Sequence, residues 1–104
     1  MNEISEKLIL LTAGVYDTQL AITQILLRNG WELGSTGKVI KKVKSAFQGS
    51  LQVFSLDTHV KDKILVKDRE GRVTAKIDLF EAMTNDQIME AAKTLNQGVK
   101  SLRA

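Results

Sequence analysis

The sequence predicts an α+β domain with N-terminal helices, a small antiparallel sheet that contains a β-hairpin, and a C-terminal helix. Apolar residues recur at helical spacing in the first third of the chain and again near its end. Between these regions, the hydrophobic pattern becomes that of extended strands, and a glycine-containing turn joins two of them. The 104 residues suit a single domain, which can bury a core without metal or disulfide links.

Two helices are predicted before residue 30. Gly14 should end the first helix, and Asp17 or Thr18 should cap a second one that continues through Arg28. The second helix is apolar around most of its circumference, so we expect it to be central or shared with another subunit. The stripe of the first helix follows the spacing i, i+4, i+7 and i+11, with Ile4, Leu8, Leu11 and Val15.

A third, lysine-rich helix is predicted from Ser35 or Thr36, which would cap it, to Gly49, which would end it. Its apolar residues share one helical face: Val39, Ile40, Val43 and Phe47. Lysines occupy the rest of the surface at positions 38, 41, 42 and 44. Before this helix, Trp31 should fold back onto the core.

The middle of the chain predicts three strands, over residues 51–56, 63–67 and 72–77. The last two should form a hairpin, because Asp68–Gly71 has the composition of a tight turn. Thr84 and Gln87 form a capping box for a C-terminal helix. The expected stripe of that helix is Ile88, Ala91, Ala92, Leu95, Val99 and Leu102.

The positive charge is concentrated in the middle of the chain. The net charge is +3 overall, and residues 35–63 alone contribute six lysines against two aspartates. There is no cysteine, which excludes disulfides, thiolate metal sites and thiol catalysis. No catalytic or metal-binding motif is present, so we expect no enzyme activity and no cofactor. The longest uncharged stretch, residues 8–16, is too short to span a bilayer, and we expect a cytoplasmic protein.

The element order resembles a winged helix-turn-helix DNA-binding domain. The resemblance implies that the third helix enters the major groove of duplex DNA and that the hairpin touches the flanking backbone. The hairpin also has a basic edge, formed by Lys63, Lys67, Arg72 and Lys76. The implied nucleic-acid site comprises Lys38, Lys41, Lys42, Lys44, Ser45, Gln48, Arg69 and Arg72. Lysines neutralise phosphates more than they discriminate bases, so we expect weak sequence specificity or recognition by a homodimer.

Other interpretations of the same residues remain open. The lysines can be the solvated side of an ordinary amphipathic helix, and the chain can be a protein–protein interaction module that uses its second or C-terminal helix. The C-terminal helix can pack on its own domain or pair in a homodimer. Gly34–Lys38 resembles a phosphate-binding loop only in part, which favours a bound backbone phosphate over nucleotide hydrolysis. His59 is expected to be a loop residue.

Overall fold

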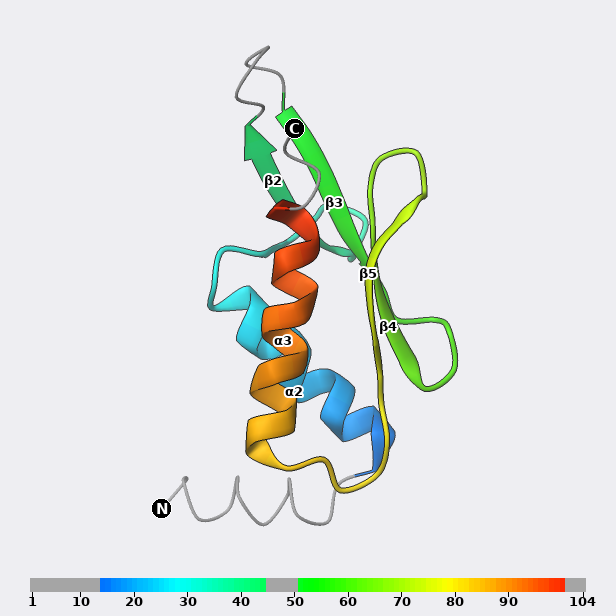
Figure 1. The fold of residues 1–104 in the computed structure, drawn as a ribbon. Helices are drawn as coiled ribbons and strands as arrows, with labels where there is room; N and C mark the ends of the chain where they lie inside the picture. The colour runs from blue at the N-terminus through cyan, green and yellow to red at the C-terminus, as the bar shows by residue number, and fades with distance from the viewer. Residues whose placement is uncertain (1–13, 45–50, 101–104) are drawn as a thin grey trace.

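The computed structural model describes residues 14–44 and 51–100 and confirms the α+β class. Five antiparallel strands follow one another across one sheet in the order β1-β2-β3-β4-β5, and two helices lie beside it (Figure 1). With the labels of Figure 1, the elements are α2 Val15–Leu27, β1 Glu32–Leu33, β2 Val39–Lys44, β3 Leu51–Asp57, β4 Lys63–Lys67, β5 Val73–Asp78 and α3 Asn85–Lys100.

Helix α2 ends as predicted but begins earlier. Gly14 is its N-cap, and the hydroxyl of Thr18 donates to the Gly14 carbonyl at 3.2 Å from within the first turn. The prediction of Asp17 or Thr18 as the cap is therefore wrong. The helix buries Ile22 and Leu26, while Leu20 keeps 41% of its surface exposed. Val15, which the prediction gave to the first helix, is the first residue of α2, and the rest of that predicted helix lies outside the described residues.

The predicted lysine helix is wrong over residues 35–44, because residues 35–38 form a turn and residues 39–44 form strand β2. Residues 45–49, the remainder of that prediction, lie outside the described residues. Strand β2 pairs with β3 in antiparallel register, with Lys41 opposite Phe54. Two of its apolar residues, Val39 and Val43, follow strand alternation, but Lys41 stands between them and Ile40 points the other way. This mixed pattern imitates helical spacing, and pairing with β3 overrides it.

The helices cover one side of the sheet, which we call the inner face. Its central residues are Phe54, Leu56, Ile64 and Val66, each at most 6% exposed. They share one hydrophobic cluster with Ile22 and Leu26 of α2 and with Ile88 and Leu95 of α3. Trp31 folds onto this core as predicted, and its indole N–H donates to the Asn96 side-chain oxygen at 3.1 Å.

The predicted hairpin and capping box are confirmed. Strands β4 and β5 are joined by a turn in which Gly71 has a φ of +86°, a conformation that favours glycine. At the start of α3, the Gln87 side chain accepts from the Thr84 N–H at 2.8 Å. In return, the Gln87 N–H donates to the Thr84 hydroxyl at 3.1 Å. The stripe is buried from Ile88 to Val99, whereas Leu102 lies outside the described residues.

Helix α3 approaches β5 closely at Gly98. A β-carbon at this position would lie 2.5 Å from the Ala75 β-carbon and 3.2 Å from the Thr74 carbonyl oxygen. Glycine therefore permits the backbone of the helix to rest against the strand. In the part of the chain that the structure describes, neither helix combines the length and the apolar character needed to cross a membrane.

Replacing Gly98 with Ala should destabilise the protein, although alanine is the better helix former. Helix propensity alone would stabilise the variant by about 1 kcal/mol. The clash with Ala75 should outweigh this gain, because overpacking typically costs about 1–3 kcal/mol. Urea unfolding measures the difference, with exposed Gln97→Ala as the control in the same turn. A Gly98→Ala variant that is more stable than the parent would refute the close approach.

Candidate nucleic-acid interface

The structure describes six of the eight residues of the predicted nucleic-acid site and separates them. Lys38 lies in the turn before β2, Lys41 is on the inner face, and Lys42 and Lys44 are on the opposite side of the same strand. Arg69 and Arg72 belong to the β4–β5 turn. Ser45 and Gln48 lie outside the described residues. The prediction that the four lysines line one helix is therefore wrong, since a strand sends alternate side chains to opposite faces.

Lys41 is turned away from the other lysines of β2. Its half-buried side chain extends under the sheet, and its ammonium lies against Gly30, in the turn that follows α2. The C-terminal end of a helix carries partial negative charge, which favours a cation there. Gly30 has a φ of +97°, and a β-carbon there would meet the Lys41 ammonium. Lys41 thus has a structural position at the end of α2.

The side of the sheet opposite the helices, here called the outer face, gathers lysines from three strands. The strand register places five lysines and three carboxylates there, a net charge of +2. The lysines are Lys42, Lys44, Lys63, Lys67 and Lys76, and the carboxylates are Glu32, Asp57 and Asp78. The basic hairpin edge was visible in the sequence. The sequence did not show that Lys42 and Lys44 of β2 lie on the same face as this edge, because that placement depends on residues 39–44 forming a strand.

Three of these lysines form ion pairs with the carboxylates of the same face. Lys42 contacts Glu32 at 3.2 Å, Lys67 contacts Asp57 at 2.8 Å, and Lys63 contacts Asp78. The hydrogen bond from Lys67, helped by one from the His59 backbone N–H, lowers the pKa of Asp57.

The other two lysines of the outer face, Lys44 and Lys76, form no ion pair among the described residues. A hydrogen bond from Lys63 lowers the pKa of Asp78, and the nearby charge of Lys76 adds a smaller effect. The ammonium groups of Lys44 and Lys76 are therefore the ones on the outer face that are most available to an external anion.

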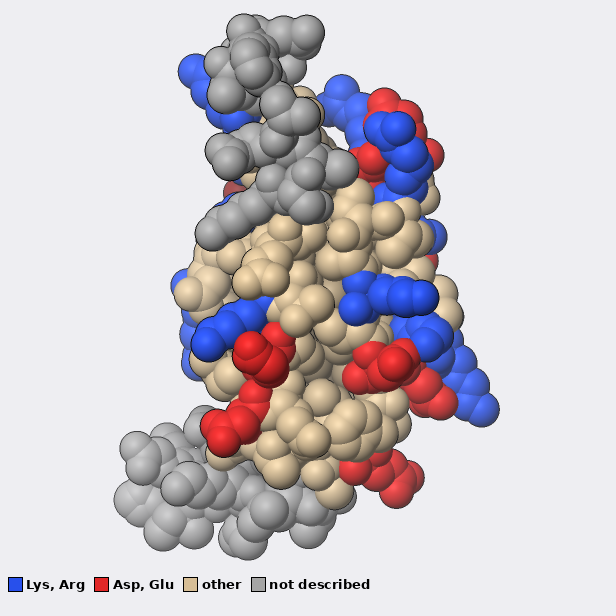
Figure 2. Space-filling view, viewed as in Figure 1, with Lys and Arg blue, Asp and Glu red and all other residues tan. Residues whose placement is uncertain are grey.

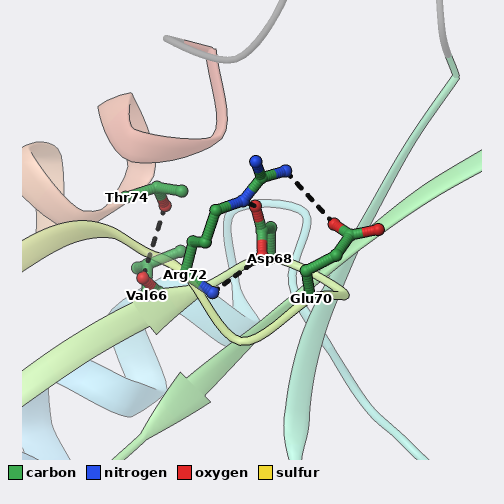
Figure 3. A network of polar contacts seen from close by, with 5 residues as sticks. All are labelled: Val66, Asp68, Glu70, Arg72 and Thr74. Carbon is green, nitrogen blue, oxygen red and sulfur yellow. Dashed lines mark hydrogen bonds and ion pairs between the residues drawn. The ribbon is translucent and has the colours of Figure 1, made fainter.

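Arg72, predicted to contact DNA from the hairpin, is engaged within its own turn (Figure 3). The Arg72 guanidinium contacts Asp68 at 2.9 Å and Glu70 at 3.3 Å, and the Arg72 backbone N–H donates to Asp68 at 2.9 Å. Desolvation would raise the pKa of Asp68, but these bonds from Arg72 leave that pKa below its usual value. Arg69 is exposed and has no ion pair among the described residues.

Two further sequence features occupy loops. Gly34–Lys38 forms a tight turn between β1 and β2, in which the Gly37 N–H donates to the Gly34 carbonyl at 3.0 Å. A strand rather than a helix follows it, so the turn lacks the helix N-terminus of a phosphate-binding loop. His59 is an exposed loop residue, as expected. Within residues 14–44 and 51–100, no group of three or more His, Cys, Asp or Glu residues is arranged to hold a metal ion.

Viewed from the side of α3, the surface carries both positively and negatively charged side chains, set among uncharged residues (Figure 2). Comparison of the chain with protein-family models, curated proteins and solved structures found no match.

Removing the Asp57 carboxylate should change how stability depends on pH. The pKa of Asp57 is lowered from 3.8 in the folded protein, so its contribution is present above about pH 4 and is lost as the pH falls through the folded value. The difference in unfolding free energy between the parent and Asp57→Asn should therefore be largest near neutrality and shrink on acidification. Urea unfolding at several pH values measures it.

The same urea unfolding measurements at several pH values, repeated in a Lys67→Gln background, test whether Lys67 causes the pH dependence of the Asp57→Asn effect. Without the hydrogen bond from Lys67, the pH-dependent part of the Asp57→Asn effect should become smaller, as in a double-mutant cycle. An unchanged pH dependence in that background would contradict the assignment to the Lys67–Asp57 pair.

Proposed function

We propose that this protein is a small regulatory or accessory protein that binds the backbone of duplex DNA through the outer face of its sheet. The observation that carries the proposal is the collection of five lysines on a side that neither described helix covers. Clustered lysines neutralise phosphate charge and release condensed counterions, which is the main source of affinity in sequence-independent binding. The interface is therefore a sheet surface and not a recognition helix.

The composition of the outer face favours backbone contact over base reading. Bidentate base recognition relies on Arg, Asn or Gln, and the strand positions of this face carry none of them. They also carry no aromatic residue on which unpaired bases could stack, since Phe54 is in the core. These features support binding that is largely independent of sequence and favour a duplex over a single strand.

The existing ion pairs limit the strength of such binding. Lys44, Lys76 and Arg69 are free of ion pairs within the described chain, whereas Lys42, Lys63 and Lys67 must exchange a carboxylate for a phosphate. Exposed ion pairs are worth at most about 1 kcal/mol, so the exchange is feasible, but it contributes little. With about three phosphates neutralised, the logarithm of the binding constant should fall with the logarithm of salt concentration at a slope of about −3.

A protein partner is the second candidate function, supported by apolar residues on the same face. Leu51 and Val73 keep 50% and 51% of their surface exposed, a feature of interaction surfaces when such residues gather. A homodimer or an adaptor would bury these residues and leave the lysines at the rim of the contact. Such an interface would respond to changes at Leu51 and Val73 and would be far less sensitive to salt.

Reversing charge at Lys44 and Lys76 should abolish most duplex binding. Fluorescence anisotropy of a labelled random duplex, titrated at several salt concentrations, measures affinity and salt dependence together. We expect the Lys44→Glu/Lys76→Glu variant to lose at least about tenfold in affinity at low salt and to have a shallower salt slope.

The matched control is Lys61→Glu/Lys93→Glu, which makes the same change of charge in the β3–β4 loop and on α3. Circular dichroism and urea unfolding confirm that both variants fold. Equal losses in the two variants would mean that total charge, and not the outer face, governs binding. Salt-insensitive self-association that Leu51→Asp removes, without duplex binding, would favour the protein-interaction function.

A further inference from the structure

A cavity of about 420 Å³ opens where the first half of α2 passes the end of β3. Its volume lies within the range of small-molecule sites, about 300–1,000 Å³. Leu20 of α2, Val39 of β2 and Leu56 of β3 give it an apolar wall. The polar part of the lining comes from α2, from the turn before β2, from residues 55–59 and from Lys67 of β4. The cavity therefore combines an apolar wall with polar groups supplied by several elements.

Lys38 is the lining cation that has no ion-pair partner among the described residues. The carboxylate in the lining, Asp57, is already satisfied. One oxygen accepts from the His59 N–H at 2.9 Å, and the other pairs with the Lys67 ammonium at 2.8 Å. With Asp57 and Lys67 offsetting each other, Lys38 leaves the cavity with an excess of positive charge. An anion entering the cavity would therefore meet a cation whose charge is not already used.

The lining also supplies neutral hydrogen-bond donors in addition to the Lys38 ammonium. Thr58 and Gln19 line the cavity, and the Thr58 hydroxyl and the Gln19 side-chain amide have no hydrogen-bond partner among the described residues. Both residues are partly buried. Together with the ammonium they provide more donors than the two oxygens of a carboxylate can accept, whereas a phosphate monoester offers three strong acceptor oxygens.

We propose that this cavity binds a small phosphate monoester with an apolar body. Lys38, Gln19 and Thr58 bind the phosphate, and the body packs against Leu20, Val39 and Leu56. The site is distinct from the two outer-face lysines that have no ion pair, because Lys38 precedes β2 and neither Lys44 nor Lys76 lines the cavity. Lys67 is the outer-face lysine that also lines it, and its ammonium is paired with Asp57. The site also gives a role to Gly37 and Lys38, the end of the Gly34–Lys38 segment, which line the cavity without a helix behind them.

Titration of the full chain with phenyl phosphate, followed by amide chemical shifts in NMR spectra, tests the proposal. Saturable shifts should cluster at residues 37–39 and 55–59, with an affinity weaker than about 10 µM for so small a probe. Phenol, which has the same ring without the phosphate, should produce no saturable shifts. Saturation by phenol, or the absence of saturation by phenyl phosphate up to about 10 mM, would overturn the proposal.

Variants assign the shifts to the lining residues. Lys38→Gln should weaken the binding of phenyl phosphate at least about tenfold, because the variant loses the charge-assisted hydrogen bond to the phosphate. Lys61→Gln, an exposed lysine outside the cavity, is the matched control and should bind as the parent does. Equal weakening in both variants would overturn the role of Lys38. Benzoate that binds as tightly as phenyl phosphate would overturn the preference for a phosphate monoester.

The Lys44→Glu/Lys76→Glu variant separates this inference from the proposed DNA function. It should lose duplex binding and keep the parent affinity for phenyl phosphate. Loss of phenyl phosphate binding in this variant would contradict a separate site. The absence of duplex binding by the parent protein would leave the cavity result intact.

Discussion

One-sided burial of the sheet is the constraint on which the rest of this structure depends. Side chains alternate along a strand, so burying Phe54, Leu56, Ile64 and Val66 under the helices sends their neighbours to the other side. A one-residue shift of register would place lysines in the core, at a cost far above that of a lost ion pair. The core thus determines which lysines share the outer face. Gly98 contributes by letting α3 rest directly on β5.

Much of the fold could be predicted from short-range signals. The β4–β5 hairpin and the capping box at Thr84 have local causes, turn geometry and side-chain to backbone hydrogen bonds, which a sequence displays directly. Burial of Trp31 followed from its size and apolar character. Each of these predictions depended on residues close in the chain or on one side chain alone.

The lysine segment could not be assigned in this way. Val39, Ile40 and Val43 fit one face of a helix, while β2 uses only Val39 and Val43 on its inner face. Lys41 occupies the inner position between them because its ammonium can reach the turn beyond α2 at Gly30. Both Gly30, where the Lys41 ammonium lies, and β3, with which β2 pairs, belong to other parts of the chain, so the local sequence does not indicate them. The error in the site followed from the error in the element, since changing helix to strand redistributes all four lysines.

The central claim is that the lysines of the outer face, and not those elsewhere, meet nucleic acid. Lysine acetylation footprinting by mass spectrometry, with and without a random duplex, tests it in the unaltered protein. Our account predicts protection of Lys44 and Lys76, with weaker protection of Lys63 and Lys67, and unchanged labelling of Lys61 and Lys93. Protection spread evenly over all lysines, or centred on Lys93 of α3, would contradict it.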